Sequence, residues 1–564
     1  MKRYLLTGIA ALALASCGTS GGKPADWDAF AQSTIDEWLA IDPAFAVYQG
    51  DHKQDGKLPD WSAEGLEKRT AFLHKIVDEA KSFTGLDKDQ AFERDYLVSV
   101  AQGQLFFLED ADYPHTNPAW YVGGGLDPNV YVSRNYADKP TRMKAMIAFF
   151  EAVPQAAANI RANLKTPMPE SFIDYGSSAF GGFADYYGGD ALAAFADVND
   201  PALQAQLKEA SGKAAAAMKD LHDWIESQRG SATQDFALGP DRFSRMLKAT
   251  ELVDIPLPDL EKVARDDLAR NQAAAKEACA QFAPGATIQQ CFAKLNEDKP
   301  DGGPVAEARR QIPELTAFVK EKDLVTIPGT EQALVEESPP YNRQNSAYID
   351  PPGPFEKGIP SIYYISPPDP AWPKAVQDAY IPGKDDLLFT SVHEVMPGHF
   401  LQFLHSNRSP SLVGRLFVGY AFAEGWAHYS EEMMWEAGLG DGKPEVHIGQ
   451  LSNALLRDCR FISAIGLHTG GMSQEQSKQL FMEQCYQDEG NAAQQAARGT
   501  YDPEYLNYTL NKLMIRKLRE DWTASRGGRQ AWKAFHDTLL GFGGPPIPLA
   551  RQAMMGGDSP KTVF

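Results

Sequence analysis

The chain has 564 residues and 43% of them are hydrophobic, which is enough for a large buried core and exceeds the usual size of one domain. Its 75 acidic and 54 basic residues give a formal charge of -21. Nucleic acid is therefore not expected as a partner, because binding to phosphates needs clustered Lys and Arg, and no basic run follows the first few residues.

The N-terminus has the pattern of a targeting segment. Lys2 and Arg3 precede an apolar run at residues 4–14, which is too short for a permanent membrane span. The run ends in LASC, which resembles a bacterial lipobox with Cys17 as the lipidated residue and mature N-terminus. We therefore predict a signal peptide at residues 1–16, followed by the lipidated cysteine and a flexible tether at 17–26.

An ordinary signal peptide cut elsewhere is the alternative to a lipoprotein. Gly18 follows the cysteine where an inner-membrane lipoprotein would have Asp, by resemblance to the bacterial sorting pattern. The sequence thus predicts an exported outer-membrane lipoprotein that faces the periplasm and reaches the membrane through its lipid.

Four further cysteines predict two disulfides. An even number in an exported protein permits pairing, and the close spacings favour Cys279 with Cys291 and Cys459 with Cys485. Free buried thiols are the alternative. None of the four has CxxC spacing, so a cysteine zinc site is not expected.

Most of the chain has the sequence pattern of helices. Apolar residues recur three and four positions apart among abundant Ala, Leu, Glu and Lys, most clearly at residues 27–40, 63–81, 140–163, 201–228 and 259–281. The pattern predicts a mainly α fold in the form of a large multi-helix body.

Strand signals are few and lie ahead of residue 384. The best are residues 324–327, 346–349 and 362–365, beside or between Pro-rich stretches. Because an edge strand can pair with an extended peptide, we expect these short strands beside the active cleft.

A composition shift at residues 328–382 indicates a boundary. It separates an N-terminal helical half, 27–327, from a half, 328–564, that holds every candidate for chemistry. One continuous domain over 27–564 also fits the sequence.

The stretch SVHEVMPGHFLQF, which begins at Ser391, contains an altered zinc-binding motif. His393 and His399 are six residues apart, about 120° around an unbroken helix, whereas an HExxH motif places its histidines on one face. Pro397 has no N–H for the carbonyl of His393, and Gly398 tolerates unusual torsions. We predict a helix over 384–405 that opens at Met396–Gly398 and so turns both histidines toward one metal. The alternative is a kinked core helix with two unrelated histidines.

A third ligand is expected from the helix predicted at residues 418–434. Zinc in a hydrolytic site takes three protein ligands and keeps a fourth position open. Glu424 lies in an apolar run, where an unpaired carboxylate is costly. His428 and Glu431 share its face and remain open as the ligand or as partners of a ligand. A salt bridge from Glu424 to a core arginine is the non-functional alternative.

Two motifs, HEVMPGHFLQ and AEGWAHYSEEM, resemble the HExxPGHxxQ and EGWAxYxE signature of a bacterial family known as domain of unknown function 885. The resemblance covers the mature chain from Trp38 to the C-terminal helices. It implies a largely helical, zincin-like fold with a pair of active-site helices. It also implies a relation to helical oligopeptidases and carboxypeptidases that use HExxH and a Glu.

The resemblance extends to residues 457–468, where relatives commonly have R-L-V-V-D-T-G-x-H. Arg460, Gly466 and His468 match, but Ala464 replaces the Asp, and later Asn511 stands where Gly is usual. No role is therefore carried over for the missing Asp. The expected metal ligands His393, His399 and Glu424 are unaffected by these departures.

The resemblance also implies roles for four residues outside the metal motifs. His468 and Tyr508 are expected to donate hydrogen bonds to the oxyanion of a scissile carbonyl. Arg460 and Arg498 are expected to hold a substrate carboxylate. A structural role remains open for each of the four.

The leading hypothesis from the sequence is a zinc metallopeptidase that cleaves short peptides. One Zn²⁺ is held by His393, His399 and Glu424, and Glu394 takes a proton as water attacks the peptide carbonyl. A zinc amidohydrolase acting on a non-peptide amide or cell-wall fragment, and a noncatalytic binding lipoprotein, are the alternatives. Mn²⁺ or Co²⁺ also suits such a ligand set.

Overall fold

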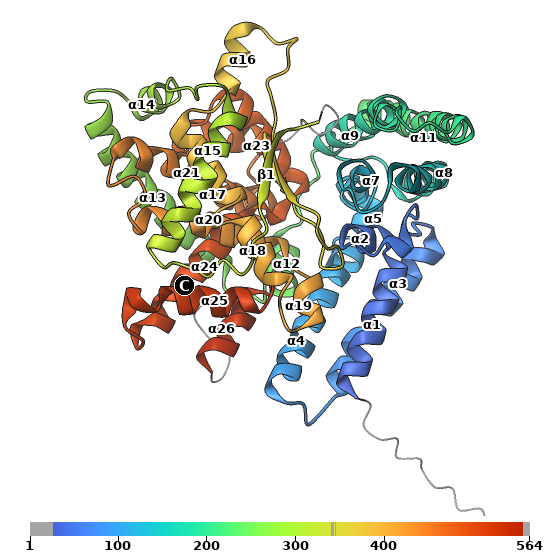
Figure 1. Ribbon diagram of the computed structural model, residues 1–564, viewed down its shortest axis with the longest axis horizontal. Coiled ribbons are helices and arrows are strands. Elements are labelled where there is room, and N and C mark those ends of the chain that lie inside the picture. Colours follow the sequence, from blue (N-terminus) through green and yellow to red (C-terminus); the bar gives the residue numbers. More distant parts are fainter. Residues whose placement is uncertain (1–25, 340–342, 344–345, 557–563) are drawn as a thin grey trace, which may run out of the picture.

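The computed structural model describes residues 26–339, 343, 346–556 and 564. The chain is mainly helical with one small sheet, as predicted (Figure 1). The predicted signal peptide and the predicted lipidation site Cys17 lie outside the described residues. No described helix combines the length and apolar character needed to cross a membrane.

The N-terminal helices build two hydrophobic clusters, one around α1, α3 and α4 and one around α8, α9 and α11. The helices of this part are α1 (Trp27–Ile41), α2 (Pro43–Tyr48), α3 (Ala63–Ser82), α4 (Lys88–Leu105), α5 (Tyr113–Thr116), α6 (Ala119–Val122), α7 (Asn129–Ser133), α8 (Lys139–Asn163), α9 (Glu170–Gly188), α10 (Asp190–Ala193) and α11 (Pro201–Ser227).

Side-chain caps fix the start of four of the helices predicted from periodicity. Asp26, Ser62, Asp138 and Asp200 each accept a hydrogen bond from a backbone N–H in the first turn of α1, α3, α8 and α11. The observed bounds therefore lie within about two residues of the predicted ones, within the usual uncertainty of helix ends.

The remaining helices form the body that carries the metal motifs. They are α12 (Pro240–Thr250), α13 (Leu257–Phe282), α14 (Ile288–Leu295), α15 (Pro304–Glu321), α16 (Lys374–Tyr380), α17 (Lys384–Glu394), α18 (His399–Ser406), α19 (Leu412–Leu416), α20 (Tyr420–Glu436), α21 (Pro444–Thr469), α22 (Gln474–Gln484), α23 (Glu489–Tyr501), α24 (Asn507–Ala524), α25 (Trp532–Gly541) and α26 (Ile547–Met555). Short helical turns are η1 (His52–Gln54), the π-helical η2 (Phe106–Asp110), η3 (Arg229–Ser231), η5 (Pro503–Leu506) and η6 (Gly528–Ala531).

One three-stranded sheet has the order β1-β3-β2. Strand β1 (Ala333–Glu337) is parallel to β3 (Ser361–Ile365), and β2 (Ala347–Asp350) is antiparallel to it. The strands predicted at 346–349 and 362–365 are thus confirmed.

The strand predicted at 324–327 is wrong. Polar groups of this segment bind side chains of α25 instead of another strand. The Asp537 carboxylate accepts hydrogen bonds from the backbone N–H and the hydroxyl of Thr326, and His536 donates to the carbonyl of Leu324. The sequence did not predict β1, because two of its five residues are Glu, which strands disfavour.

The largest hydrophobic cluster crosses the boundary placed near residue 328. Phe243 of α12, Leu268 of α13 and Leu315 of α15 belong to the same cluster as Val392 of α17 and Leu510 of α24. Helices from residue 240 onward are therefore packed into the body that carries the metal motifs.

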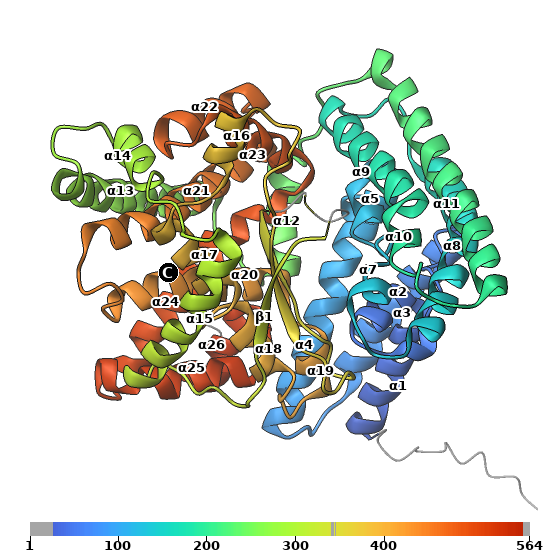
Figure 2. The same ribbon diagram turned by 45° about the horizontal axis from the view of Figure 1, so that its top comes forward.

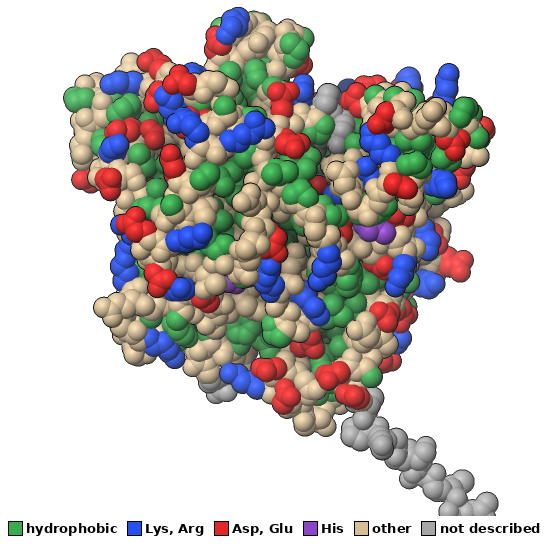
Figure 3. Space-filling model, in the orientation of Figure 1, with side chains coloured by type: hydrophobic (Ala, Val, Ile, Leu, Met, Phe, Trp, Pro, Cys, Tyr) green, Lys and Arg blue, Asp and Glu red, His purple; other side chains and the backbone are tan. Residues whose placement is uncertain are grey.

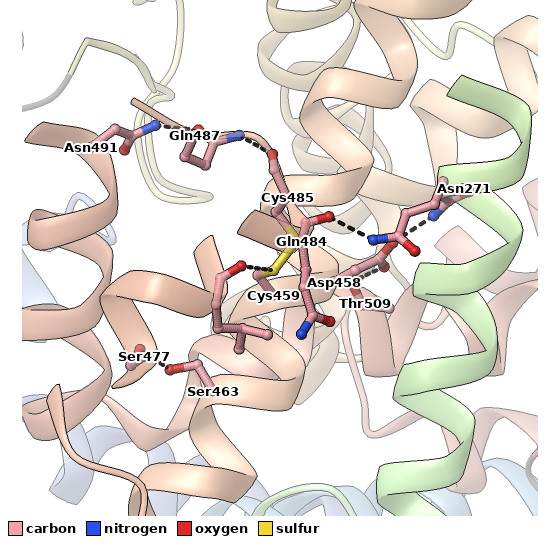
Figure 4. The surroundings of a disulfide bond; sticks show 12 residues. Asn271, Asp458, Cys459, Ser463, Ser477, Gln484, Cys485, Gln487, Asn491 and Thr509 are labelled. Carbon is pink, nitrogen blue, oxygen red and sulfur yellow. Dashed lines mark hydrogen bonds between the residues drawn. A yellow bond between two sulfur atoms is a disulfide. The ribbon is translucent and has the colours of Figure 1, made fainter. Parts of the chain in front are cut away.

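Both predicted disulfides are confirmed. Cys279–Cys291 joins α13 to α14, and Cys459–Cys485 joins α21 to the end of α22. Beside the second bond, Asp458 accepts hydrogen bonds from Asn271 of α13 and Thr509 of α24 (Figure 4). The disulfide thus lies where three long helices of the body meet.

A buried ion-pair network ties the N-terminal helices to β2. The Arg134 guanidinium is 3% exposed and contacts the carboxylates of Asp350 and Glu356 at 2.7 and 2.9 Å. His52 extends the network, since its ring nitrogens lie 2.9 Å from Asp55 and 3.2 Å from Glu356.

Stability is expected to fall with rising pH because of His52. Burial lowers the pKa of His52, but hydrogen bonds with Asp55 and Glu356 outweigh it and raise the pKa from 6.5 to about 9. The raised pKa means that the folded state binds the proton more tightly, so the stabilisation is complete below pH 6.5 and is lost as pH rises through 9. Urea unfolding at pH 6 and pH 9 should show that the free energy of unfolding falls more for the wild type than for His52→Gln. An equal fall in both proteins would contradict the raised pKa of His52.

Candidate metal centre

A cavity of about 2690 Å³ lies between the N-terminal helices and the body with the metal motifs. Helices α1, α2, α4 and α9 contribute to one wall, and α17, α20, α21 and α23 to the other (Figure 2). Seven of the eight predicted site residues in the described chain line it: His393, Glu394, His399, Glu424, Arg460, Arg498 and Tyr508. His468 does not line the cavity.

The outer surface carries mixed charge. On the face in Figure 3, Lys and Arg side chains are scattered among Asp and Glu side chains. The motifs that point to chemistry lie inside the molecule, on the cavity wall.

The predicted opening of the helix at the Pro-Gly step is confirmed. Helix α17 ends at Glu394 and α18 begins at His399, so the break spans Val395–Gly398, one residue more than predicted. The backbone N–H of Gly398 donates to the carbonyl of Val392 at 2.9 Å. A Cβ on Gly398 would overlap the carbonyl oxygen of His393, so only glycine fits this approach of backbone to backbone.

The break brings the two histidines together with Glu424. The rings of His393 and His399 are 4.7 Å apart between centroids, and their Nε2 atoms lie 3.2 and 3.4 Å from Oε2 of Glu424. Within the described chain, these are the residues whose possible ligand atoms converge, all within 4.8 Å of one another.

This donor set fits a zinc ion. Four ligands at ~2.1 Å in a tetrahedron lie about 3.4 Å apart, which matches the separations from Glu424 to the two histidines. Burial raises the pKa of Glu424, but the histidines lower it well below its ordinary value, so the group is an anion. Two imidazoles and one carboxylate, with one side on the cavity, are the residue types that hold zinc in known hydrolytic sites.

Glu431 orients His393 rather than completing the ligand set. Nδ1–H of His393 donates to Oε1 of Glu431 at 2.7 Å, which leaves Nε2 free to face Glu424. Glu431 is fully buried and contacts Arg457 at 3.3 Å and His428 at 3.5 Å. Burial raises the pKa of Glu431, but Arg457 and the hydrogen bond from His393 outweigh it, so the carboxylate stays ionised.

His428 lies beyond Glu431, away from the cluster of ligand atoms. It is fully buried, and burial lowers its pKa to about 3, so the ring is neutral. Of the three candidates for the third ligand, the structure therefore places Glu424 with the histidines.

Glu394 is a buried carboxylate that forms no hydrogen bond or ion pair with another described residue. It is 9% exposed and lines the cavity beside His393. A carboxylate in this position is available to accept a proton from a molecule in the cavity.

The Tyr508 ring lies beside His393 and near three arginines. Its ring is nearly parallel to that of His393, with 6.4 Å between centroids. The guanidinium carbons of Arg457, Arg460 and Arg498 lie 5.6, 4.7 and 5.9 Å from its centre. The predicted residues Tyr508, Arg460 and Arg498 are thus brought together on the cavity wall.

The structure does not bring His468 to this site. Its Nε2–H donates to the carbonyl of Gly499 at 2.7 Å, and its Nδ1 accepts from the backbone N–H of Leu238 at 3.2 Å. Burial lowers its pKa to about 4. Both nitrogens bind backbone groups, so its position fits the structural role that the sequence left open, and we leave it out of the proposed site.

The two departures from the family pattern lie in the interior. Asn511 packs against Gly425, where a Cβ would overlap the Asn511 side chain, and it donates to the carboxylate of Glu251 at 3.3 Å. Ala464 is fully buried in the main hydrophobic cluster.

Sequence reasoning missed two residues that hold the site in place. Arg457 neutralises Glu431, and Trp426 donates its indole N–H to the carbonyl of Pro397 at 2.9 Å, which fixes the break to α20. Both belong to segments already singled out, Arg457 as the first residue of the 457–468 stretch and Trp426 within EGWA.

The fold and this site define a mainly helical protein with two histidines and one glutamate on a cavity wall. The chain belongs to the family described as "Bacterial protein of unknown function (DUF885)", whose model matches residues 43–554. No curated protein matches the sequence.

Two solved structures share the fold. One, assigned as a lipoprotein of unknown function from Shewanella oneidensis, is 25% identical with a TM-score of 0.77, and the match covers 94% of this chain and 100% of that one. The other, assigned as a lipoprotein from Colwellia psychrerythraea, is 18% identical with a TM-score of 0.79 and coverage of 94% and 98%.

Replacing Gly398 with Ala is expected to disrupt the break. The added Cβ overlaps the carbonyl of His393, so the substitution should destabilise the fold by about 2–4 kcal/mol. Gly212→Ala is the matched control, because Gly212 lies in helix α11 with open space around it and alanine favours helix. Chemical unfolding checks both variants; equal stability of the two would contradict the assigned contact.

Proposed function

We propose that this protein is a zinc-dependent metallopeptidase that cleaves short peptides in its cavity. The observation that carries the proposal is the convergence of His393, His399 and Glu424 beside the unpaired carboxylate of Glu394. Zinc in such a site lowers the pKa of a bound water to about 7 and polarises a carbonyl oxygen.

The side chains around the cluster supply the remaining functions. Glu394 takes a proton from the attacking water and passes it to the leaving amine. Glu431 holds His393 in the orientation and tautomer that direct Nε2 to the cluster. Tyr508, whose ring lies beside that of His393 on the cavity wall, is the proposed hydrogen-bond donor to the carbonyl oxygen.

The cavity wall offers a place for an extended peptide. Strand β2 is at the edge of the sheet, and Ala347, Tyr348 and Ile349 line the cavity. An edge strand can bind a peptide through its free backbone groups. The enclosing helices favour short peptides as substrates.

We further propose that the protein is lipidated on Cys17 and faces the periplasm from the outer membrane. The two similar structures come from proteins assigned as lipoproteins. Two disulfides also fit an oxidising compartment outside the cytoplasm.

The first test compares metal content and peptide hydrolysis of wild type, Glu394→Gln and His399→Ala. We expect one zinc per chain in the wild type and in Glu394→Gln, with the rate of Glu394→Gln reduced about 10²- to 10⁴-fold through loss of the base. His399→Ala should lose the metal.

Other outcomes of this test point to the alternatives. Absence of stoichiometric metal in the wild type would favour a noncatalytic binding lipoprotein. Hydrolysis of small amides or cell-wall fragments but not of peptide pools would indicate an amidohydrolase.

Glu431→Gln is expected to weaken zinc binding by about 10- to 100-fold, because the neutral side chain no longer polarises His393. Competition with a chromophoric chelator measures the affinity. Glu432→Gln is the matched control: the adjacent carboxylate is also buried but pairs with Arg270 and Lys512. The control should lose stability and keep its zinc affinity, and a similar loss of affinity in both variants would contradict the role of Glu431.

A further inference from the structure

The Arg460 guanidinium is a buried cation that pairs with no carboxylate of the described residues. Its side chain is 8% exposed, and its Nε donates to the side-chain oxygen of Gln495 at 2.8 Å. Within residues 26–339, 343, 346–556 and 564, its two terminal nitrogens form no hydrogen bond and no ion pair, although the residue lines the cavity. Burial of an uncompensated charge is costly, so an anionic group of a molecule bound in the cavity would be a favourable partner for these nitrogens.

The two neighbouring arginines are already paired. Arg457 contacts Glu431 at 3.3 Å. Arg498 donates to Asp502 and to the hydroxyl of Tyr420, both at 2.9 Å. Arg460 therefore carries the one uncompensated charge among the three guanidiniums at the Tyr508 ring, and repulsion from Arg498 adds to burial in lowering its pKa.

Two distances through Tyr508 set an upper limit on how far the Arg460 guanidinium lies from the His393 ring. Tyr508 is next to both, 4.7 Å from the Arg460 guanidinium carbon and 6.4 Å from the His393 ring. An extended chain covers ~3.4 Å per residue, so one to three residues bridge the interval. A guanidinium binds a carboxylate through two parallel hydrogen bonds.

We propose that Arg460 binds the free C-terminal carboxylate of the substrate, so that the enzyme is a carboxypeptidase that removes the last one to three residues. The inference rests on the proposed peptidase function. Water adds across the scissile bond: its oxygen becomes part of the new C-terminal carboxylate, and its proton passes through Glu394 to the amine of the released fragment.

The test uses N-acetylated tri- to pentapeptides made in two forms, with a free C-terminal carboxylate and with a C-terminal amide. For the wild type we expect kcat/KM for the acid to exceed that for the amide by about 10- to 100-fold, as for a hydrogen bond to a charged group. In Arg460→Met, kcat/KM for the acid should fall to about that for the amide, and kcat/KM for the amide should fall much less than that for the acid. Arg460→Lys should restore part of the preference.

Arg265→Met is the control variant, since Arg265 is exposed and pairs only with Glu261 in the described chain; it should keep the acid preference. Mass spectrometry of the products should place the cut within three residues of the C-terminus. Equal rates for acid and amide in the wild type, or cuts far from the C-terminus, would overturn the proposal. An equal fall in kcat/KM for the acid and the amide in Arg460→Met would show that Arg460 has a structural role instead.

Binding separates this proposal from the proposed function. Calorimetry on zinc-loaded Glu394→Gln compares the same acid and amide peptides without turnover. If neither peptide is hydrolysed by the wild type but the acid binds more tightly through Arg460, the peptidase function fails and the carboxylate site stands. If hydrolysis occurs and both forms bind equally, the carboxylate site fails alone.

Discussion

The site depends on the close approach of Gly398 to the carbonyl of His393. This contact lets the chain turn between α17 and α18 and return His399 to the side of His393. The indole of Trp426 then binds the carbonyl of Pro397. Because Trp426 and Glu424 lie on the same helix, α20 both fixes the break and supplies the carboxylate beside the two histidines, so the three side chains are positioned together.

Helix α20 is itself held by buried charges on two sides. Glu431 contacts His393 of α17 and Arg457 of α21, whereas the next residue, Glu432, contacts Arg270 of α13 and Lys512 of α24. A buried ion pair is costly to break, since removal of one partner leaves the other uncompensated. Small rotations of α20 would break both sets of contacts, which makes the orientation of Glu424 rigid.

The features that could be predicted from the sequence depend on contacts within one turn of helix. Those that could not be predicted depend on contacts between residues distant in the chain. Caps such as Ser62 and the Pro397–Gly398 step act within one turn of helix, so the helix bounds and the break could be inferred from neighbouring residues. The direction of His468 is set by Gly499 and Leu238, which are distant in sequence. For the same reason the pairing of Arg457 with Glu431 was not foreseen, and residues 324–327 bind α25 instead of joining the sheet.

Some buried charges of the cavity wall lack the ion pairs that join the charged side chains around Lys512 in the core. Core charges such as Lys512, Asp267 and Glu432 compensate one another, whereas Glu394 and Arg460 have no partner of opposite charge in the described chain. Folded proteins tolerate such exceptions mainly at functional sites, where a ligand completes the pairing. In the proposed function, a peptide with a free C-terminus would meet both needs, because its carboxylate would compensate Arg460 while its scissile bond would lie near Glu394. In the proposed reaction, Glu394 and Arg460 would give the substrate a direction along the wall, with its C-terminus toward α21 and α23.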